Sequence, residues 1–176
     1  MTDPSRDDPA TGVDVRRVRP EEWAAFRDLR LRALAHDPLA FGSTLDRERG
    51  FPDGRWKEWT ARGASSSESA DFVADAGGRE LVGAAAVAFV EGEWHVFAMW
   101  VDPAFRRRGL GGRLLDTGLE WFRATAPHRS LRLDVNPRQA DAVRLYESRG
   151  FRRTGSSSPL GHTAGETVEA MVLEPQ

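Results

Sequence analysis

The chain has 176 residues, a net charge of −2 and no cysteine. This length suffices for one domain with a substantial core, and the lack of cysteine excludes disulfides, thiolate zinc sites and a cysteine acyl-enzyme. The charge gives no general attraction to nucleic acid, and no apolar run reaches the roughly 20 residues that cross a bilayer.

The start of the chain lacks the apolar segment of a secretory signal, so we expect a cytoplasmic protein with neither nucleic acid nor membrane among its partners. Residues 1–12 are predicted to be a disordered lead-in, and residues 13–175 a single domain.

The first part of this domain is predicted to hold a strand and two helical regions. Residues 13–18 alternate apolar and charged side chains, which indicates a strand. A helix then begins near Pro20 and stops by Asp37, because the residue before Pro38 disfavours helical backbone. The apolar stripe of this helix comprises Trp23, Phe26, Leu29, Leu31 and Leu34, and its polar side comprises Arg27, Arg30 and Arg32.

Residues 39–44 are predicted to form a loop that exposes Phe41. A second helical region follows, is interrupted at residues 50–54 and resumes around Trp56. Residues 62–70 are rich in serine and are predicted to be a surface loop.

Three strands joined by tight turns follow, at residues 72–75, 81–90 and 94–101, and form an antiparallel meander. The last of them is apolar on both faces apart from His95, so we expect it to be central and covered on both sides. Its two expected faces are Trp94, Val96, Ala98 and Trp100 on one side, and Phe97, Met99 and Val101 on the other.

The pattern then changes to helices that alternate with strands. Helices are predicted at residues 109–124 and 140–148, and strands at residues 131–135, 151–156 and 167–173. The strand after the first of these helices is expected to return parallel to the sheet by a right-handed crossover. The fold class is therefore α/β or α+β, with a mixed sheet that carries helices on its faces.

Residues 99–115 join an apolar strand to an amphipathic helix through a basic, glycine-rich turn. Gly109 and Gly111 allow backbone N–H groups to approach a ligand, and the helix N-terminus favours an anion. The spacing matches neither the Walker A loop nor the Rossmann fingerprint. Taken alone, the turn is equally well explained as an anion site or as an ordinary connection with surface arginines.

Two further motifs favour the first of these interpretations, the anion site. Val101-Asp102-Pro103 and Arg106-x-x-Gly109-x-Gly111 are followed by the strand at residues 131–135 and by Leu145-Tyr146-x-x-x-Gly150-Phe151. This arrangement over residues 94–151 resembles the GNAT superfamily of acetyl-CoA-dependent N-acetyltransferases. The resemblance implies a central mixed sheet of about six to seven strands flanked by about four helices.

The resemblance also implies acetyl-CoA as cosubstrate and no metal. The backbone of residues 99–101 would align the pantetheine arm, and amides of residues 107–112 would bind the pyrophosphate. Gln139, with Asn136 three residues earlier, stands where many members have an asparagine that contacts this arm. The expected cofactor residues are Met99, Trp100, Val101, Arg106, Arg107, Arg108, Gly109, Leu110, Gly111, Gly112, Gln139 and Asn136.

Tyr146 is the only tyrosine and falls where the family places a general acid, although a core tyrosine at the end of an apolar helix face is the alternative. Asp134 matches by position a glutamate that acts as base in some members. Glu93 and Glu91 are reserves for that role, and for each of the three a plain surface carboxylate is the alternative. His95 is a further candidate base, or a hydrogen-bonded sheet residue.

The resulting prediction is an N-acetyltransferase that moves an acetyl group from acetyl-CoA to a primary amine by direct transfer in a ternary complex. The alternative is a non-catalytic acyl-CoA-binding or sensing domain on the same fold. Phe41, Trp56 and Trp59 fall in the region that covers the acceptor pocket in this family. The sequence determines neither the small-molecule or peptide acceptor nor the oligomeric state, and homodimers are common among relatives.

Overall fold

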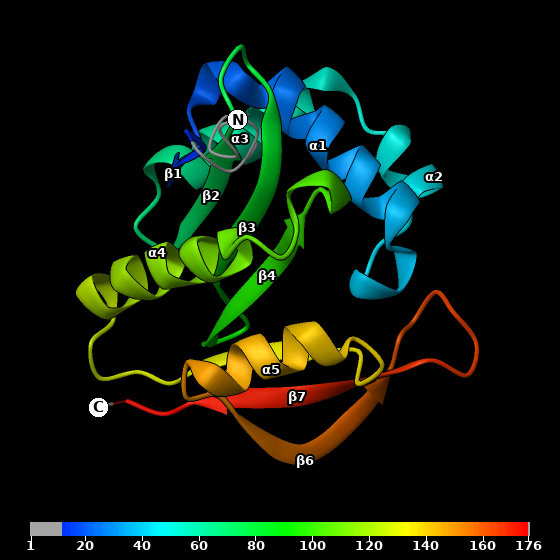
Figure 1. Ribbon diagram of the computed structural model, residues 1–176, viewed down its shortest axis with the longest axis vertical. Coiled ribbons are helices and arrows are strands. Elements are labelled where there is room, and N and C mark those ends of the chain that lie inside the picture. Colours follow the sequence, from blue (N-terminus) through cyan, green and yellow to red (C-terminus); the bar gives the residue numbers. More distant parts are fainter. Residues whose placement is uncertain (1–11, 176) are drawn as a thin grey trace, which may run out of the picture.

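A seven-stranded mixed sheet organises residues 12–175, which are the residues that this computed structural model describes (Figure 1). The first eleven residues of the predicted lead-in lie outside the described residues. The strand order is β1-β2-β3-β4-β5-β7-β6, and every pair is antiparallel except β4 with β5. The strands are β1 (Asp14–Arg17), β2 (Ser69–Asp75), β3 (Leu81–Val90), β4 (Glu93–Val101), β5 (Leu131–Val135), β6 (Arg152–Pro159) and β7 (Thr167–Leu173).

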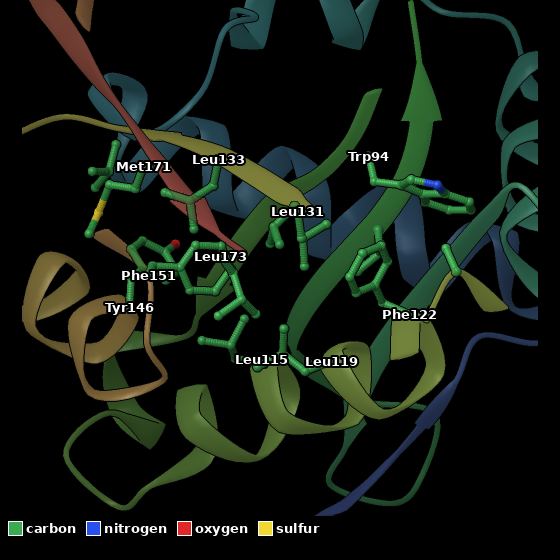
Figure 2. Packing of buried hydrophobic residues seen from close by; sticks show 14 of the residues in the cluster. Trp94, Leu115, Leu119, Phe122, Leu131, Leu133, Tyr146, Phe151, Met171 and Leu173 are labelled. Carbon is green, nitrogen blue, oxygen red and sulfur yellow. The ribbon is translucent and has the colours of Figure 1, made fainter. Parts of the chain in front are cut away.

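Five α-helices in the described part of the chain cover the two faces of the sheet. They are α1 (Trp23–His36), α2 (Leu45–Arg49), α3 (Asp53–Ser65), α4 (Leu110–Thr125) and α5 (Ala140–Ser148). One face packs against α1 and α3, and the other against α4 and α5. Figure 2 shows Leu115 of α4, Leu133 of β5 and Tyr146 of α5 within the second of these interfaces. The predicted fold class is thus confirmed.

Several local predictions differ from the structure. The segment predicted as a loop at residues 62–70 is largely regular, because α3 continues to Ser65 and β2 already begins at Ser69. Helix α3 also begins at Asp53, within the predicted interruption. Within this serine-rich segment the hydroxyl of Ser65, the last residue of α3, donates to the carbonyl of Ala61 at 2.9 Å.

The buried ion pair between α1 and α2 corrects two further predictions. Arg30, expected on the polar side of α1, donates two hydrogen bonds to the buried carboxylate of Glu48, at 2.9 and 2.7 Å. Its guanidinium lies 4.5 Å from the ring centroid of Phe41. Phe41 is therefore buried rather than exposed, because the paired Arg30 covers it.

Asp71 of β2 is a buried acid beneath α3, with 2% of its surface exposed. The Oδ2 atom of this carboxylate has no hydrogen-bond partner among the described residues. The close approach requires Gly63, since a Cβ at that position would overlap Oδ2. Burial raises the pKa of Asp71 to about 7, and it outweighs the opposing effects of Arg62 and Trp59.

We expect Asp71→Asn to stabilise the protein above neutral pH. The native pKa lies above the unfolded value of 3.8, so the wild type loses stability as pH rises from about 4 to 7. The asparagine variant lacks this loss, and its advantage should reach a few kcal/mol at pH 8, at about 1.4 kcal/mol per pKa unit. Urea unfolding at pH 4.5 and pH 8 measures the difference.

The exposed Glu80→Gln variant is the matched control and should show no such pH-dependent gain. An Asp71→Asn advantage that is equal at both pH values would contradict the prediction.

Candidate functional site

The candidate site lies where strands β4 and β5 diverge. These parallel strands pair at only two positions, Trp94 with Leu131 and His95 with Arg132. Beyond His95 their facing edges diverge, and backbone groups on these edges have no neighbouring strand to bond. A cavity opens on each side of this divergence.

A β-bulge in β4 sets the direction of its side chains at this point. Ala84 pairs with Trp100 and Ala86 with Phe97, so one residue of β3 stands opposite two residues of β4. Within the bulge Ala98 has a φ of +54°. An extra residue reverses the alternation of side chains along the rest of the strand.

The bulge overturns the predicted faces of β4. Trp94 and Val96 pack with α4, whereas Trp100 packs on the opposite face with α1 and α3. The expectation that these residues share one face with Ala98 is wrong. So is the expectation that β4 is covered on both sides, because Phe97 is 42% exposed.

The first cavity, here named the turn cavity, has a volume of about 590 Å³ and lies against the glycine-rich turn and α5. Gly109 precedes α4 with a φ of +77°, and Arg107 also has a positive φ of 65°. The N–H groups of Leu110, Gly111 and Gly112 are the first three of α4 and have no partner within the helix. The positive end of the helix dipole adds to them, so the cavity suits an anion.

Most of the predicted cofactor residues line the turn cavity. They are Met99, Trp100, Val101, Arg106, Arg107, Gly109, Leu110, Gly111, Gly112 and Gln139. Arg108 is exposed and is not among the lining residues, and Asn136 lies on the other cavity. The Asn136 amide donates to Glu166 at 3.0 Å, and its carbonyl oxygen accepts from the backbone of Arg138 at 3.0 Å.

The second cavity, here named the sheet cavity, has a volume of about 600 Å³ and lies over β2 to β5 beneath α1 and α3. Asp134 of β5 is exposed to it, and so is His95, whose ring stacks on Phe97 with centroids 5.4 Å apart. Phe41 and Trp59 line it as well, whereas Trp56 belongs to the core and does not.

The reserve acids predicted on the hairpin between β3 and β4 lie outside both cavities. Glu93 is half exposed and pairs with Arg132, with 3.0 Å between its Oε1 and the arginine Nε. Its other oxygen lies 3.9 Å from Nε2 of His95. Glu91 is exposed in the turn itself, at a φ of +53°. Neither residue lines the turn cavity or the sheet cavity.

The two cavities share a wall. A chemical group could be transferred at this wall from a ligand in one cavity to a ligand in the other. The shared residues are Ala40, Met99, Gln139, Ala142 and Tyr146. Tyr146 is buried, its ring packs edge-on against Phe151, and burial raises the pKa of its phenol above the usual value. It therefore stays protonated at neutral pH and can donate a hydrogen bond.

Sequence reasoning missed Asp37, which lines the turn cavity. Its Oδ2 accepts hydrogen bonds from Trp100 Nε1 at 2.7 Å and from Arg106 Nη2 at 2.5 Å. Burial raises the pKa of Asp37, but these bonds and the charge of Arg106 outweigh it, so the pKa lies below its usual value. The dipeptide Asp37-Pro38 indicates only a helix end in the sequence, because Trp100 and Arg106 lie 63 and 69 residues away from Asp37.

Among the described residues, no group of three or more histidines, cysteines or acids could hold a metal ion. Within the same residues, no helix is long and apolar enough to cross a membrane.

Comparisons with known proteins agree with this geometry. The model of the acetyltransferase (GNAT) family matches residues 23–151. The chain is 31% identical over 166 residues to mycothiol acetyltransferase from Acidothermus cellulolyticus, covering 82% of this chain and 46% of that protein. It is 38% identical over 63 residues to N-alpha-acetyltransferase RimI from Mycobacterium tuberculosis, covering 36% and 37%. The chain thus spans less than half the length of these curated relatives.

Solved structures share the fold. An acetyltransferase of the GNAT family from Streptococcus pneumoniae superimposes with a TM-score of 0.79 at 22% identity, covering 93% of this chain and 99% of that one. A putative acetyltransferase from Salmonella typhimurium, solved with its cofactor acetyl-CoA, gives a TM-score of 0.75 at 21% identity, covering 93% and 94%.

Proposed function

The chain belongs to the acetyltransferase (GNAT) family, and we propose that it transfers the acetyl group of acetyl-CoA to a primary amine by direct attack in a ternary complex. The observation that carries this proposal is the wall common to the two cavities. Because Met99 and Tyr146 face both of them, a thioester in one and an amine in the other could meet there.

Acetyl-CoA fits the chemistry of the turn cavity. Its diphosphate matches the amides at the start of α4, where Gly109 adopts the left-handed backbone that the turn requires. Its pantetheine amides match the backbone of residues 99–101, on the edge of β4 that diverges from β5. The Nε of Arg106 donates a hydrogen bond to the carbonyl of Val101 at 2.8 Å. This arginine therefore fixes the conformation of the turn and also adds a positive charge to the cavity.

The amine would bind in the sheet cavity and must lose a proton before it attacks, because aliphatic amines have pKa values near 10. Asp134 is the proposed base, acting through water. His95 lines the same cavity, but it pairs with Arg132, two residues before Asp134 on β5, and thus lies further from the shared wall. Glu93 and Glu91 are not proposed, because they lie outside the cavity.

In the proposed reaction the amine nitrogen attacks the thioester carbonyl and forms a C–N bond. Backbone N–H groups near residues 99–101 would stabilise the oxyanion of the tetrahedral intermediate. The intermediate then loses the second nitrogen proton and collapses by breaking the C–S bond, while the phenol of Tyr146 gives a proton to the departing thiolate. The proton from nitrogen, carried by water, restores the phenol. The products are coenzyme A and an N-acetylated amine.

Initial-rate kinetics test the order of these events. We expect double-reciprocal plots that intersect when acetyl-CoA and amine are varied together, since both substrates must be bound before transfer. Parallel lines, or an acetylated enzyme isolated in the absence of amine, would exclude direct transfer. Coenzyme A binding without turnover across a broad amine panel would instead indicate an acyl-CoA-binding domain.

Tyr146→Phe removes the phenol hydroxyl and retains the ring that packs against Phe151. We expect kcat to fall about 100-fold. The dissociation constant for coenzyme A and the melting temperature should change little, because the variant loses no apolar contact. A variant with unchanged kcat would show that Tyr146 is only a core residue.

The lining of the sheet cavity supports a further proposal about the group that carries the amine. Among the described residues the exposed large apolar side chains are Phe89, Val90 and Phe97, and the last two line this cavity. Exposed apolar surface that continues into a binding cavity favours an apolar ligand. We therefore expect an acceptor whose amine is attached to an aliphatic or aromatic group.

Phe97→Ala should raise KM for phenethylamine about tenfold, since an apolar contact worth about 1.5 kcal/mol is lost, and should leave KM for ethanolamine nearly unchanged. Phe89→Ala is the matched control, because Phe89 is 37% exposed on the same hairpin but does not line the cavity. Equal effects of Phe97→Ala on both amines would contradict an apolar acceptor site.

A further inference from the structure

Asp37 joins three parts of the molecule that are distant in sequence. It follows the last residue of α1, and its Oδ2 accepts from the indole of Trp100 on β4 and from the guanidinium of Arg106 in the glycine-rich turn. A third donor, His36 Nδ1, lies 3.1 Å from the same oxygen. One carboxylate oxygen therefore fixes the end of α1 against the end of β4 and the turn.

Arg106 extends this network to the backbone that borders the turn cavity. While its Nη2 contacts Asp37 at 2.5 Å, its Nε donates to the carbonyl of Val101 at 2.8 Å. A guanidinium can hold both partners at once because its donors lie in a rigid plane. A second tether lies nearby, where Arg32 of α1 contacts Asp102 at 2.6 Å.

The residues that follow Asp37 form a wall of the other cavity. Ala40 faces both cavities, and Phe41, Gly42 and Ser43 line the sheet cavity. Residues 37–43 thus run from the turn cavity to the sheet cavity. The loop between β6 and β7 contacts this segment too, with Nε2 of His162 lying 3.2 Å from the carbonyl oxygen of Pro38.

We propose that Asp37 is a positioning residue that couples occupancy of the turn cavity to the order of residues 37–43, and so prepares the acceptor wall when coenzyme A or acetyl-CoA binds. This inference rests on the proposed function. A ligand diphosphate on the turn holds Arg106 in place, Arg106 holds Asp37, and Asp37 anchors the segment that reaches the sheet cavity. By linkage, an acceptor that orders residues 37–43 tightens cofactor binding by the same factor.

The coupling is measured with coenzyme A alone, so no acceptor need be known. Titration calorimetry gives its dissociation constant, and hydrogen–deuterium exchange follows a peptide that covers residues 38–46, with and without coenzyme A. In the wild type we expect slower exchange in this peptide when coenzyme A is bound. In Asp37→Asn we expect about tenfold weaker binding, from the loss of charge-assisted hydrogen bonds, and little protection of the peptide at saturating coenzyme A.

Trp100→Phe is the second variant, and it removes one hydrogen-bond donor to Asp37 while it retains an aromatic ring. It replaces Asp37→Asn in the same two measurements if Asp37→Asn does not fold. Asp28→Asn is the matched control, since Asp28 is an exposed acid on α1 that pairs only with Arg27 among the residues described, and it should behave as wild type. A double-mutant cycle of Asp37→Asn with Arg106→Lys should be strongly non-additive in the dissociation constant.

The outcomes separate this inference from the proposed function. Two results would overturn the coupling and leave the acetyltransferase proposal standing. In the first, coenzyme A binds the wild type but does not slow exchange in the peptide. In the second, coenzyme A slows exchange equally in the wild type and in Asp37→Asn. Wild-type protein that does not bind coenzyme A overturns both. Protection that is lost in Asp37→Asn and retained in Asp28→Asn supports the role of Asp37.

Discussion

The site depends on the divergence of β4 and β5. A continuous sheet would bond every backbone group on these two edges, whereas here they pair only at His95 and the residue before it. The bulge at Ala98 adds to this by reversing the side chains of the diverging part of β4. Trp100 is thereby directed into the core under α1, whereas Phe97 precedes the bulge and faces the sheet cavity by ordinary alternation with Val96. The divergence thus determines which backbone groups face a ligand, and the bulge determines the direction of the side chains that follow Phe97.

Arginine side chains connect neighbouring elements of this fold at two places. Arg17 donates to three backbone carbonyls, those of Gly63, Ser66 and Ser69, at 2.7 to 2.8 Å. Arg106 similarly bridges a carboxylate and a carbonyl. A lysine ammonium is a point charge on a flexible stem and cannot reproduce these planar, multiple contacts. At these two positions arginine therefore makes contacts that lysine could not replace.

The sequence predicts an element correctly where a regular pattern of residue types identifies its first and last residues. Regular apolar patterns give the bounds of β3, β5, α5 and β7. Gly150, which has a positive φ of 91°, follows the end of α5. The bulge could not be predicted from the sequence, because β4 is apolar at nearly every position. A shift of one residue along such a strand exchanges one apolar side chain for another, so the sequence pattern does not reveal it. The burial of Phe41 depends on Arg30 and its partner Glu48, and the role of Asp37 on Arg106, 69 residues away. Such contacts are properties of the folded chain and have no local signal.

The burial of Tyr146 bears on the chemistry proposed for it. A phenol whose pKa is raised by burial is a weaker acid than free tyrosine, which by itself opposes proton transfer to a thiolate. A thiolate that forms in the same wall is desolvated by the same surroundings, so its proton affinity rises as well. The difference between the two pKa values, which sets the strength of the hydrogen bond and the direction of transfer, is therefore largely preserved. Burial also keeps the phenol protonated, so its hydroxyl is available as a hydrogen-bond donor when the C–S bond breaks.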